Sequence, residues 1–243
     1  MLKNVKWFIG CSGFYYKEWK RNFYPDKLPQ NKWFSYYCSQ YNTLELNVTF
    51  YRFPQLSFLE NWYNKSPEEF MFSVKAPRTI THYRQFQNCE QLLKEFYEVV
   101  KEGLKNKLGC ILFQLPAGFE YSKEKLDRII HVLDNNFDNV IEFRNIGWWN
   151  KKVYDGLANK RISFCGVSIN NLPDKPILNS KVVYYRFHGV PQLYTSSYNE
   201  KEMKKVANAI AKDQTAKKAF IYFNNTAALS AIHNARWLQQ YVK

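Results

Sequence analysis

Short hydrophobic runs alternate with longer amphipathic stretches along the whole chain. Eight runs rich in Val, Ile, Phe and Tyr predict β-strands, and their continuous hydrophobic character is typical of parallel strands buried on both faces. These runs cover residues 5–11, 43–48, 71–76, 110–115, 140–144, 162–168, 182–188 and 219–225. Between them, apolar residues spaced by three and four predict helices over residues 30–41, 55–64, 89–102, 123–134, 151–159, 200–212 and 227–242. Asn199 followed by Glu202 predicts a capping box at the start of one of these helices.

This alternation predicts an α/β fold. Residues 170–181 contain two prolines and no helical period, so we expect the sixth crossover to be an irregular loop. Eight strands with interleaved crossovers in a chain of 243 residues fit a (β/α)8 TIM barrel. The rival is an open doubly wound sheet, but no GxGxxG sequence follows the first run. No linker or exact repeat interrupts the pattern, so residues 1–243 are predicted to form a single domain.

The alternation within each strand predicts which side chains meet inside the barrel. Successive residues of a barrel strand point alternately inward and toward the helices. On six strands the apolar residues share one parity, and polar residues occupy the other near the carboxyl end, where barrel enzymes keep their chemistry. The residues expected to converge there are Glu45, Asn47, Lys75, Gln114, Glu142, Arg144, Arg186, His188 and Asn224, with Cys11 and Ser168 as additions from strands one and six.

The charge balance of this set favours a binding site over a closed structural network. Buried Lys, Arg and Glu are rare unless paired, and buried ion pairs are a poor source of stability. Three cations against two carboxylates leave one positive charge in surplus, which suits a phosphate- or carboxylate-bearing ligand. Glu45, Glu142 and His188 are the predicted acid/base catalysts, although a structural role fits His188 equally well. The residues predicted to bind the substrate are Asn47, Lys75, Gln114, Arg144, Arg186 and Asn224, with His82 from the loop after the third strand.

Two loops belong to the predicted mouth of the barrel. Residues 75–84, KAPRTITHYR, bring Lys75, Arg78, His82 and Arg84 to it, either as an ordinary basic loop or as a rim that steers anions. Residues 12–25 are crowded with aromatic side chains. We expect them to pack over the end of the barrel rather than to act as a lid or a stacking platform.

Composition narrows the partners and the compartment. Thirty-five Lys and Arg against 21 Asp and Glu give a net charge of +14, which suggests an anionic partner. Many lysines alternate with acidic residues on predicted helices, so much of this charge is expected to be solvated surface. No apolar run reaches the roughly 18–20 residues that span a bilayer, and the amino-terminal sequence has no secretory pattern. Five scattered cysteines without a CxxC pair argue against disulfides and favour a cytoplasmic location.

The motifs at these positions resemble the domain-of-unknown-function 72 family, also called YecE-like. The matching stretches are IGCSGFYYKEW (9–19), FYP (23–25), LELNVTFYRFP (44–54), FMFSVKAPRTITH (70–82), LFQLPAGF (112–119), EFRNIGWW (142–149), YYRFHG (184–189), IYFNN (221–225) and AIHNAR (231–236). The resemblance implies a TIM barrel and no particular reaction. Its recurrent polar positions fall on Glu45, Asn47, Thr49, Lys75, His82, Gln114, Glu142, Arg144, Arg186, His188, Asn224 and Asn225, of which Asn225 has the opposite parity.

The chain departs from the family pattern at several positions. Ser168 and Asn170 stand where the family often has Asp and Pro. Asn145 and Gly147 stand where His and Ser are common, and Cys11 stands where Thr is usual. If the strand-six Asp is a catalytic base in relatives, this chain is altered there, so Ser168 is given no catalytic role.

Three functions fit the sequence. The first is an enzyme that acts on a small anionic substrate, with hydrolysis, isomerisation and lyase chemistry all open. The second is nucleic-acid binding or processing, which the net charge and the aromatic content favour. The third is ligand binding without turnover. No cofactor is predicted, and a single divalent cation on Glu45 and Glu142 is the weaker alternative. The oligomeric state is left open.

Overall fold

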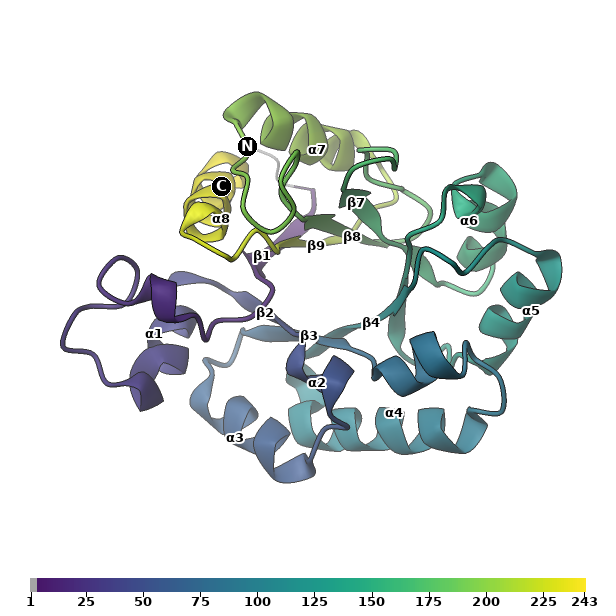
Figure 1. Ribbon diagram of the computed structural model, residues 1–243, viewed down its shortest axis with the longest axis horizontal. Helices are drawn as coiled ribbons and strands as arrows, with labels where there is room; N and C mark the ends of the chain where they lie inside the picture. The colour runs from purple at the N-terminus through teal and green to yellow at the C-terminus, as the bar shows by residue number, and fades with distance from the viewer. Residues whose placement is uncertain (1–3) are drawn as a thin grey trace.

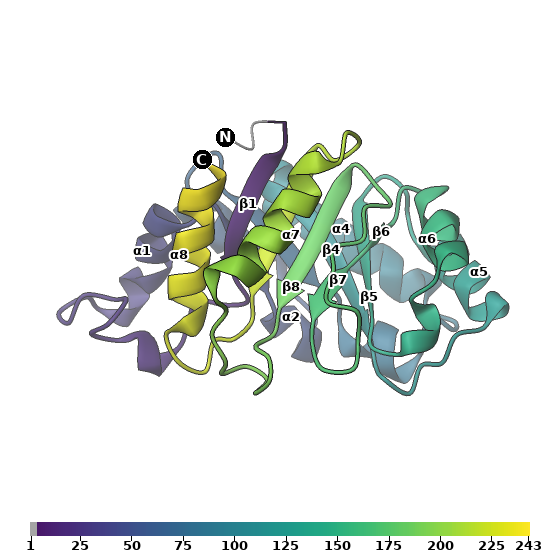
Figure 2. The same cartoon turned by 90° about the horizontal axis from the view of Figure 1, so that it is seen from above.

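Parallel strands lie around a common centre, and helices surround them (Figures 1 and 2). The computed structural model describes residues 4–243. The strands are β1 (Lys6–Cys11), β2 (Thr43–Leu46), β3 (Met71–Lys75), β4 (Leu108–Leu115), β5 (Asp138–Phe143), β6 (Ser163–Phe164), β7 (Gly166–Ser168), β8 (Val182–Phe187) and β9 (Lys218–Phe223). The α-helices are α1 (Trp33–Gln40), α2 (Val48–Tyr51), α3 (Leu56–Lys65), α4 (Glu90–Leu104), α5 (Lys123–Val132), α6 (Lys151–Ala158), α7 (Glu200–Lys212) and α8 (Ser230–Val242).

Most predicted elements are present with small shifts at their ends. The second predicted strand stops at Leu46, because the chain turns at Asn47 into the short helix α2. The sixth divides at Cys165 into β6 and β7. Residues 169–181 contain no helix, as predicted. The predicted capping box at the start of α7 is formed by Asn199 and Glu202.

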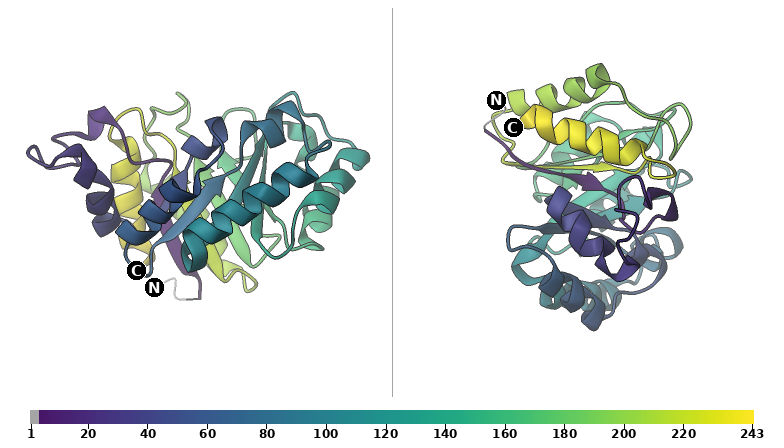
Figure 3. Two further views of the ribbon diagram at one scale, coloured as in Figure 1. Left: turned by 90° about the horizontal axis from the view of Figure 1, so that it is seen from below. Right: turned by 90° about the vertical axis from the view of Figure 1, so that its left-hand side faces the viewer.

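The strands form two parallel sheets rather than one continuous ladder. One sheet has the order β1-β9-β8-β7 and the other β2-β3-β4-β5-β6. In Figure 1 the two sheets face each other across the centre, and α7 and α8 pack together outside β8, β9 and β1 (Figure 3). The fold is therefore α/β and consistent with a TIM-like barrel, but the sheets are not closed.

Where β1 meets β2, the backbones form one isolated parallel bridge, between Ser12 and Glu45, and side chains complete the rest of the junction. The Tyr37 hydroxyl accepts a hydrogen bond from the Cys11 amide at 2.7 Å and donates one to the Thr43 carbonyl at 3.0 Å. The Asn42 Oδ1 atom accepts a bond from the Ile9 amide at 3.1 Å. These bonds satisfy backbone groups that would otherwise be left without partners at the gap.

The close approach at this junction requires a glycine in β1. A Cβ atom on Gly10 would lie 2.3 Å from the Thr43 carbonyl oxygen and 2.8 Å from the Tyr37 hydroxyl. Gly10→Ala is therefore expected to lower the free energy of unfolding by about 1–3 kcal/mol through overpacking, measured by urea denaturation. Gly118→Ala is the control, because a Cβ atom there meets nothing within 4 Å. Equal effects of the two substitutions would contradict the steric argument.

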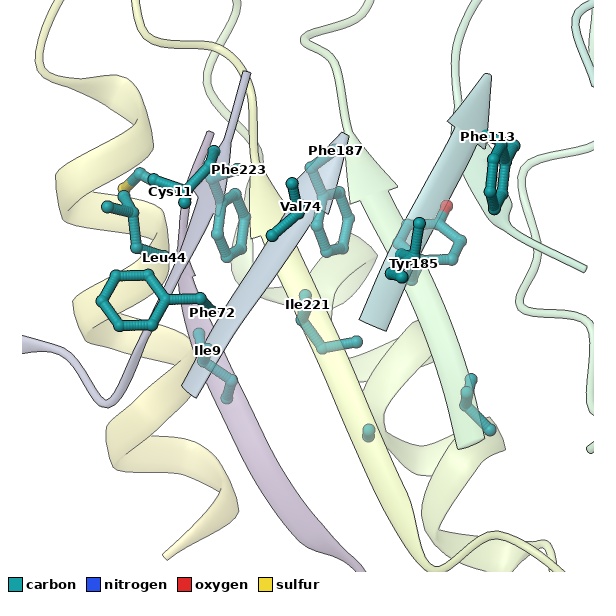
Figure 4. Close-up of a cluster of buried hydrophobic side chains, with 14 of the residues drawn as sticks. Ile9, Cys11, Leu44, Phe72, Val74, Phe113, Tyr185, Phe187, Ile221 and Phe223 are labelled. Atoms are coloured by element: carbon teal, nitrogen blue, oxygen red, sulfur yellow. The ribbon is translucent and has the colours of Figure 1, made fainter. Parts of the chain in front are cut away.

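Two layers of apolar side chains confirm most of the predicted parity. The larger outer cluster joins strand residues such as Leu44, Phe72 and Phe113 to the inner faces of the helices, and Figure 4 shows part of it. The inner cluster, between the two sheets, consists of Phe8, Cys110, Leu112, Val140, Cys165, Val167, Val182, Tyr184, Phe220 and Tyr222.

Two of the predicted inward residues face outward instead. Cys11 belongs to the outer cluster together with Leu44 (Figure 4), because it shares the parity of Ile9. Ser168 is in register with Phe187, another outer-cluster residue, so it also has outward parity. The prediction that Cys11 and Ser168 join the inward polar set is wrong, and both are buried against the helical layer.

The aromatic loop after β1 packs mainly against helices. The rings of Tyr24 and Trp33 stack with centroids 4.4 Å apart, and Trp19 donates a hydrogen bond to the Ala228 carbonyl. The loop is thus fixed between α1 and the approach to α8. No helix within residues 4–243 is long and apolar enough to cross a bilayer.

Candidate functional site

A buried arginine connects both sheets at the carboxyl ends of their strands. Arg186 on β8 donates to Glu45 on β2 and to Glu142 on β5, with both N–O distances 2.7 Å. All three side chains are almost completely buried. Tyr184 donates a further bond of 2.6 Å to Glu45. Arg186 therefore holds the two predicted catalytic carboxylates in one ionic layer.

The layers below explain why these charged groups lie at the mouth. The lower interior is apolar and includes the stacked rings of Phe8 and Phe220, 4.6 Å apart. Above it, the Tyr222 hydroxyl bonds to Ser73 at 2.9 Å and also to Thr43. Because side chains alternate along each strand, the next inward-facing residues toward the carboxyl ends are those of the ionic layer. The interior therefore becomes more polar toward the carboxyl ends of the strands.

A second guanidinium joins the network from the end of β5. Arg144 forms an ion pair with Glu142, and its terminal nitrogen lies 3.1 Å from His188 Nε2. The Asn224 amide lies 3.0 Å from His188 Nδ1. Because an arginine is always a donor, Nε2 is the acceptor in its contact with Arg144. Strands β5, β8 and β9 thus supply one connected group.

The charges in this group fix the protonation states. Burial raises the pKa of Glu142, but the adjacent guanidiniums of Arg144 and Arg186 outweigh it and hold the pKa well below the usual value. Burial and the same guanidiniums hold the pKa of His188 well below its usual value. Glu142 is therefore a carboxylate and His188 a neutral imidazole at pH 7.

Lys75, at the end of β3, carries the surplus charge of the site. Its Nζ atom donates to Gln114 Oε1 at 2.9 Å and lies 3.9 Å from the centre of the Phe50 ring. Both Arg186 and Arg144 are paired with carboxylates, whereas within residues 4–243 Lys75 forms no ion pair. Burial, with the nearby Arg186 charge, lowers the pKa of Lys75 to about 8.

The remaining predicted residues lie at the edge of the cluster or outside it. His82 bonds to Thr81, and its ring lies 5.0 Å from Phe50, so it belongs to the rim beside Lys75. Asn225 donates to the Ser196 carbonyl and to Asn234 Oδ1. Its contacts hold the loop before α7, and the structure does not bring it to the ionic cluster.

A cavity of about 330 Å³ lies beside Glu45, and sequence reasoning did not identify it. Ser12, Tyr16, Asn47 and Trp62 line it, among others. Asn47 was predicted to bind the substrate, and Ser12 and Tyr16 belong to the loop predicted to pack over the barrel end, but the sequence does not show how that loop folds back to form a cavity. The Tyr184 contact to Glu45 was also missed, although its inward parity was a signal that could have found it.

The donor atoms of the cluster do not suit a divalent cation. No group of three or more metal-ligating side chains occurs within residues 4–243. Glu45 and Glu142, the pair considered from the sequence, already accept bonds from Arg186, Tyr184 and Arg144. A cation there would have to displace a guanidinium.

Known proteins match over most of the chain. UPF0759 protein YunF of Bacillus subtilis (strain 168) is 26% identical over 252 residues, which is 88% of this chain and 87% of that protein. UPF0759 protein YecE of Escherichia coli (strain K12) is 27% identical over 144 residues, or 58% of this chain and 52% of YecE.

Solved structures agree with the fold. A DUF72 family protein from Thermotoga maritima MSB8 has a TM-score of 0.88 at 24% identity and covers 98% of this chain and 99% of its own. A DUF72 family protein from Enterococcus faecalis V583 has a TM-score of 0.81 at 22% identity and covers 97% of this chain and 94% of its own. The family model described as protein of unknown function DUF72 matches residues 8–243. That match runs over nearly the whole chain, so the protein belongs to the DUF72 family, as the sequence motifs implied.

Proposed function

We propose that the mouth formed by the carboxyl ends of β3, β5, β8 and β9 binds the phosphate or carboxylate group of a small substrate. Lys75 carries this proposal, because it is the one ionisable cation of the cluster that has no ion-pair partner within residues 4–243. Arg144 is 15% exposed and offers further N–H donors beside it. A positively charged, half-buried site of this kind binds anions through charge-assisted hydrogen bonds.

The contacts support a division of roles within this site. Glu45 and Glu142 are held as ion pairs, so they act on the substrate through the positions of Arg186 and Arg144. Lys75, with a pKa of about 8, exchanges a proton near neutral pH and is the acid/base group that we favour. His188 donates or accepts hydrogen bonds as a neutral imidazole. We further propose that the two sheets function as one TIM-like barrel with this mouth as its active end.

Sulfate binding tests the proposal, because the charge of sulfate is constant between pH 6 and 10. Lys75→Met is expected to weaken sulfate binding about 10–100-fold at pH 7, measured by calorimetry, since it removes a charged donor. In the wild type, affinity should fall as the pH rises through and above 8, because the ammonium then loses its proton.

Lys75→Arg is the matched variant, because a guanidinium stays charged throughout this range. It should keep sulfate binding at pH 9, where the wild type has lost most of it. Equal affinities of wild type and Lys75→Met would contradict anion binding by Lys75, whereas a flat pH profile in the wild type would contradict the lowered pKa of Lys75.

A nucleic-acid partner is the second candidate, and one rim feature favours it. The Arg78 guanidinium lies 5.8 Å from the Tyr51 ring and 5.4 Å from the Tyr83 ring. Both tyrosines are more than half exposed. Exposed aromatic rings beside cations are typical of surfaces that stack unpaired bases. This rim is smaller and less enclosed than the cluster around Lys75, so the small anionic substrate remains our first proposal.

A further inference from the structure

The cavity beside Glu45 is bordered by the loop that follows β1 and by α3. Tyr15, Tyr16 and Trp62 supply aromatic rings to its wall, and Ser12 and Asn47 supply polar atoms. Its volume of about 330 Å³ is at the lower end of the range for small-molecule sites. The cavity is therefore large enough for one ring of a ligand and too small for a polymer.

Local backbone geometry gives this cavity a defined wall. Gly13 has φ = +101°, a conformation that side-chain-bearing residues rarely adopt, and it turns the loop back over the strand end. The Tyr16 hydroxyl then donates to the Ser12 carbonyl at 2.6 Å. A Cβ atom on Gly13 would lie 2.7 Å from that hydroxyl. The position of the Tyr16 ring is thus fixed by the turn.

Two polar atoms in this wall lack the partners that buried groups normally have. Ser12 Oγ and Asn47 Oδ1 are buried, and neither forms a hydrogen bond within residues 4–243. The Ser12 side chain is completely inaccessible to solvent. Buried polar atoms in native proteins are nearly always paired, so a ligand group is the simplest partner. A hydroxyl group suits both atoms, because it can donate and accept.

The cavity adjoins the ionic cluster at Glu45 on β2. Glu45 lines the cavity, and its carboxylate accepts the bond from Arg186. Leu46 is in register with Val74 on β3, and Thr49, two residues after Asn47, donates a hydrogen bond of 2.6 Å to the Lys75 carbonyl. The segment that carries Asn47 therefore runs beside the end of β3. One small molecule can therefore place a ring against Asn47 and an anionic group toward Lys75.

We infer that this cavity binds the neutral, hydroxyl-bearing ring of the substrate, which makes the substrate a monosaccharide that carries a phosphate or carboxylate group. The ring would pack on the aromatic wall, and its hydroxyls would form the missing hydrogen bonds to Ser12 Oγ and Asn47 Oδ1. This inference rests on the proposed function, because it takes the anion site at Lys75 as the second half of the same binding site.

A comparison of sugar phosphates with inorganic phosphate tests the inference. Glucose 6-phosphate, fructose 6-phosphate, ribose 5-phosphate and inorganic phosphate are titrated at pH 7 by calorimetry. At least one sugar phosphate should bind ten or more times tighter than inorganic phosphate. Ser12→Val, which replaces the unpartnered hydroxyl with methyl groups, and Trp62→Ala, which removes an aromatic wall, should each abolish most of this tenfold preference. Both variants should keep the affinity for inorganic phosphate within twofold.

The outcomes separate this inference from the proposed function. Trp237→Ala is the control, because Trp237 is also half-buried but lies on α8 and is absent from the cavity wall. If inorganic phosphate does not bind, the proposed function fails, whatever the sugar phosphates do. If inorganic phosphate binds and no sugar phosphate binds tighter, the inference is overturned. It is also overturned if Ser12→Val and Trp62→Ala both still bind a sugar phosphate more tightly than inorganic phosphate by the wild-type factor.

Discussion

Replacing Arg186 with methionine is expected to lower the free energy of unfolding by about 3–5 kcal/mol, the usual loss when one partner of a buried ion pair is removed. Arg186 donates to Glu45 and Glu142 at 2.7 Å each, and both carboxylates are inaccessible to solvent. Methionine preserves much of the side-chain volume, so the loss reports the charge rather than a cavity. Glu142 would retain Arg144, whereas Glu45 would retain only Tyr184. Urea denaturation at pH 7 measures the change.

An exposed ion pair gives the matched control for this substitution. Arg21 pairs with Asp26 at 2.8 Å, but its side chain is 74% exposed. Arg21→Met should therefore change the free energy of unfolding by about 1 kcal/mol or less. The double variant Arg186→Met/Glu45→Gln should be more stable than Arg186→Met alone, because it removes the unpaired buried charge. If Arg186→Met and Arg21→Met lose the same stability, the ionic layer is not what holds the mouth together.

Strand alternation made most of the ionic cluster predictable from the sequence. Glu45, Glu142 and Arg186 share the inward parity of three strands that are distant in the sequence, and the structure brings them within hydrogen-bonding distance. Lys75 on β3 and Gln114 on β4 belong to the same predicted inward set, and a 2.9 Å bond joins them in the structure. Alternation works here because each strand is buried on both faces, so a polar residue on one parity is conspicuous.

Pairing within the cluster could not be predicted in the same way. Parity gives the face on which a side chain lies but not which neighbour it contacts. The sequence predicts Glu142 as an acid/base candidate but does not reveal its bonds to Arg186 and Arg144, which hold it as a carboxylate. The count of charges was nevertheless informative, because the surplus of one positive charge is found at Lys75.

Errors were concentrated where strands end and loops begin. Parity across β1 was assigned without knowing its pairing with β9, so Cys11 was expected to face inward. Strand two was expected to continue to Val48, but Asn47 has helical dihedral angles and begins the turn into α2. Both ends border the cavity beside Glu45. Burial of the aromatic rings in the first loop was predicted, but they were expected over the end of the barrel, whereas Trp19 and Tyr24 pack beside α1 and the approach to α8.

Replacing Trp148 with alanine is the second change with a large expected effect, a loss of about 3–5 kcal/mol in the free energy of unfolding. Its ring is completely buried and stacks on Phe143 at 4.0 Å and on Phe119 at 5.4 Å. The indole nitrogen donates to the Phe119 carbonyl at 2.7 Å. These contacts fix the segment after β5, and that segment begins with Arg144.

The same substitution should also weaken anion binding, because Arg144 directly follows Phe143 and loses its support when the stack is removed. Sulfate affinity in folded Trp148→Ala protein should fall several-fold at pH 7, whereas Trp148→Phe, which keeps a ring in the stack, should recover most of the affinity and stability. Trp237→Ala again serves as the control, since its half-buried ring on α8 should cost less stability and leave sulfate binding unchanged. A Trp148→Ala protein with reduced stability but wild-type sulfate affinity would show that Arg144 is positioned by Glu142 and His188 alone.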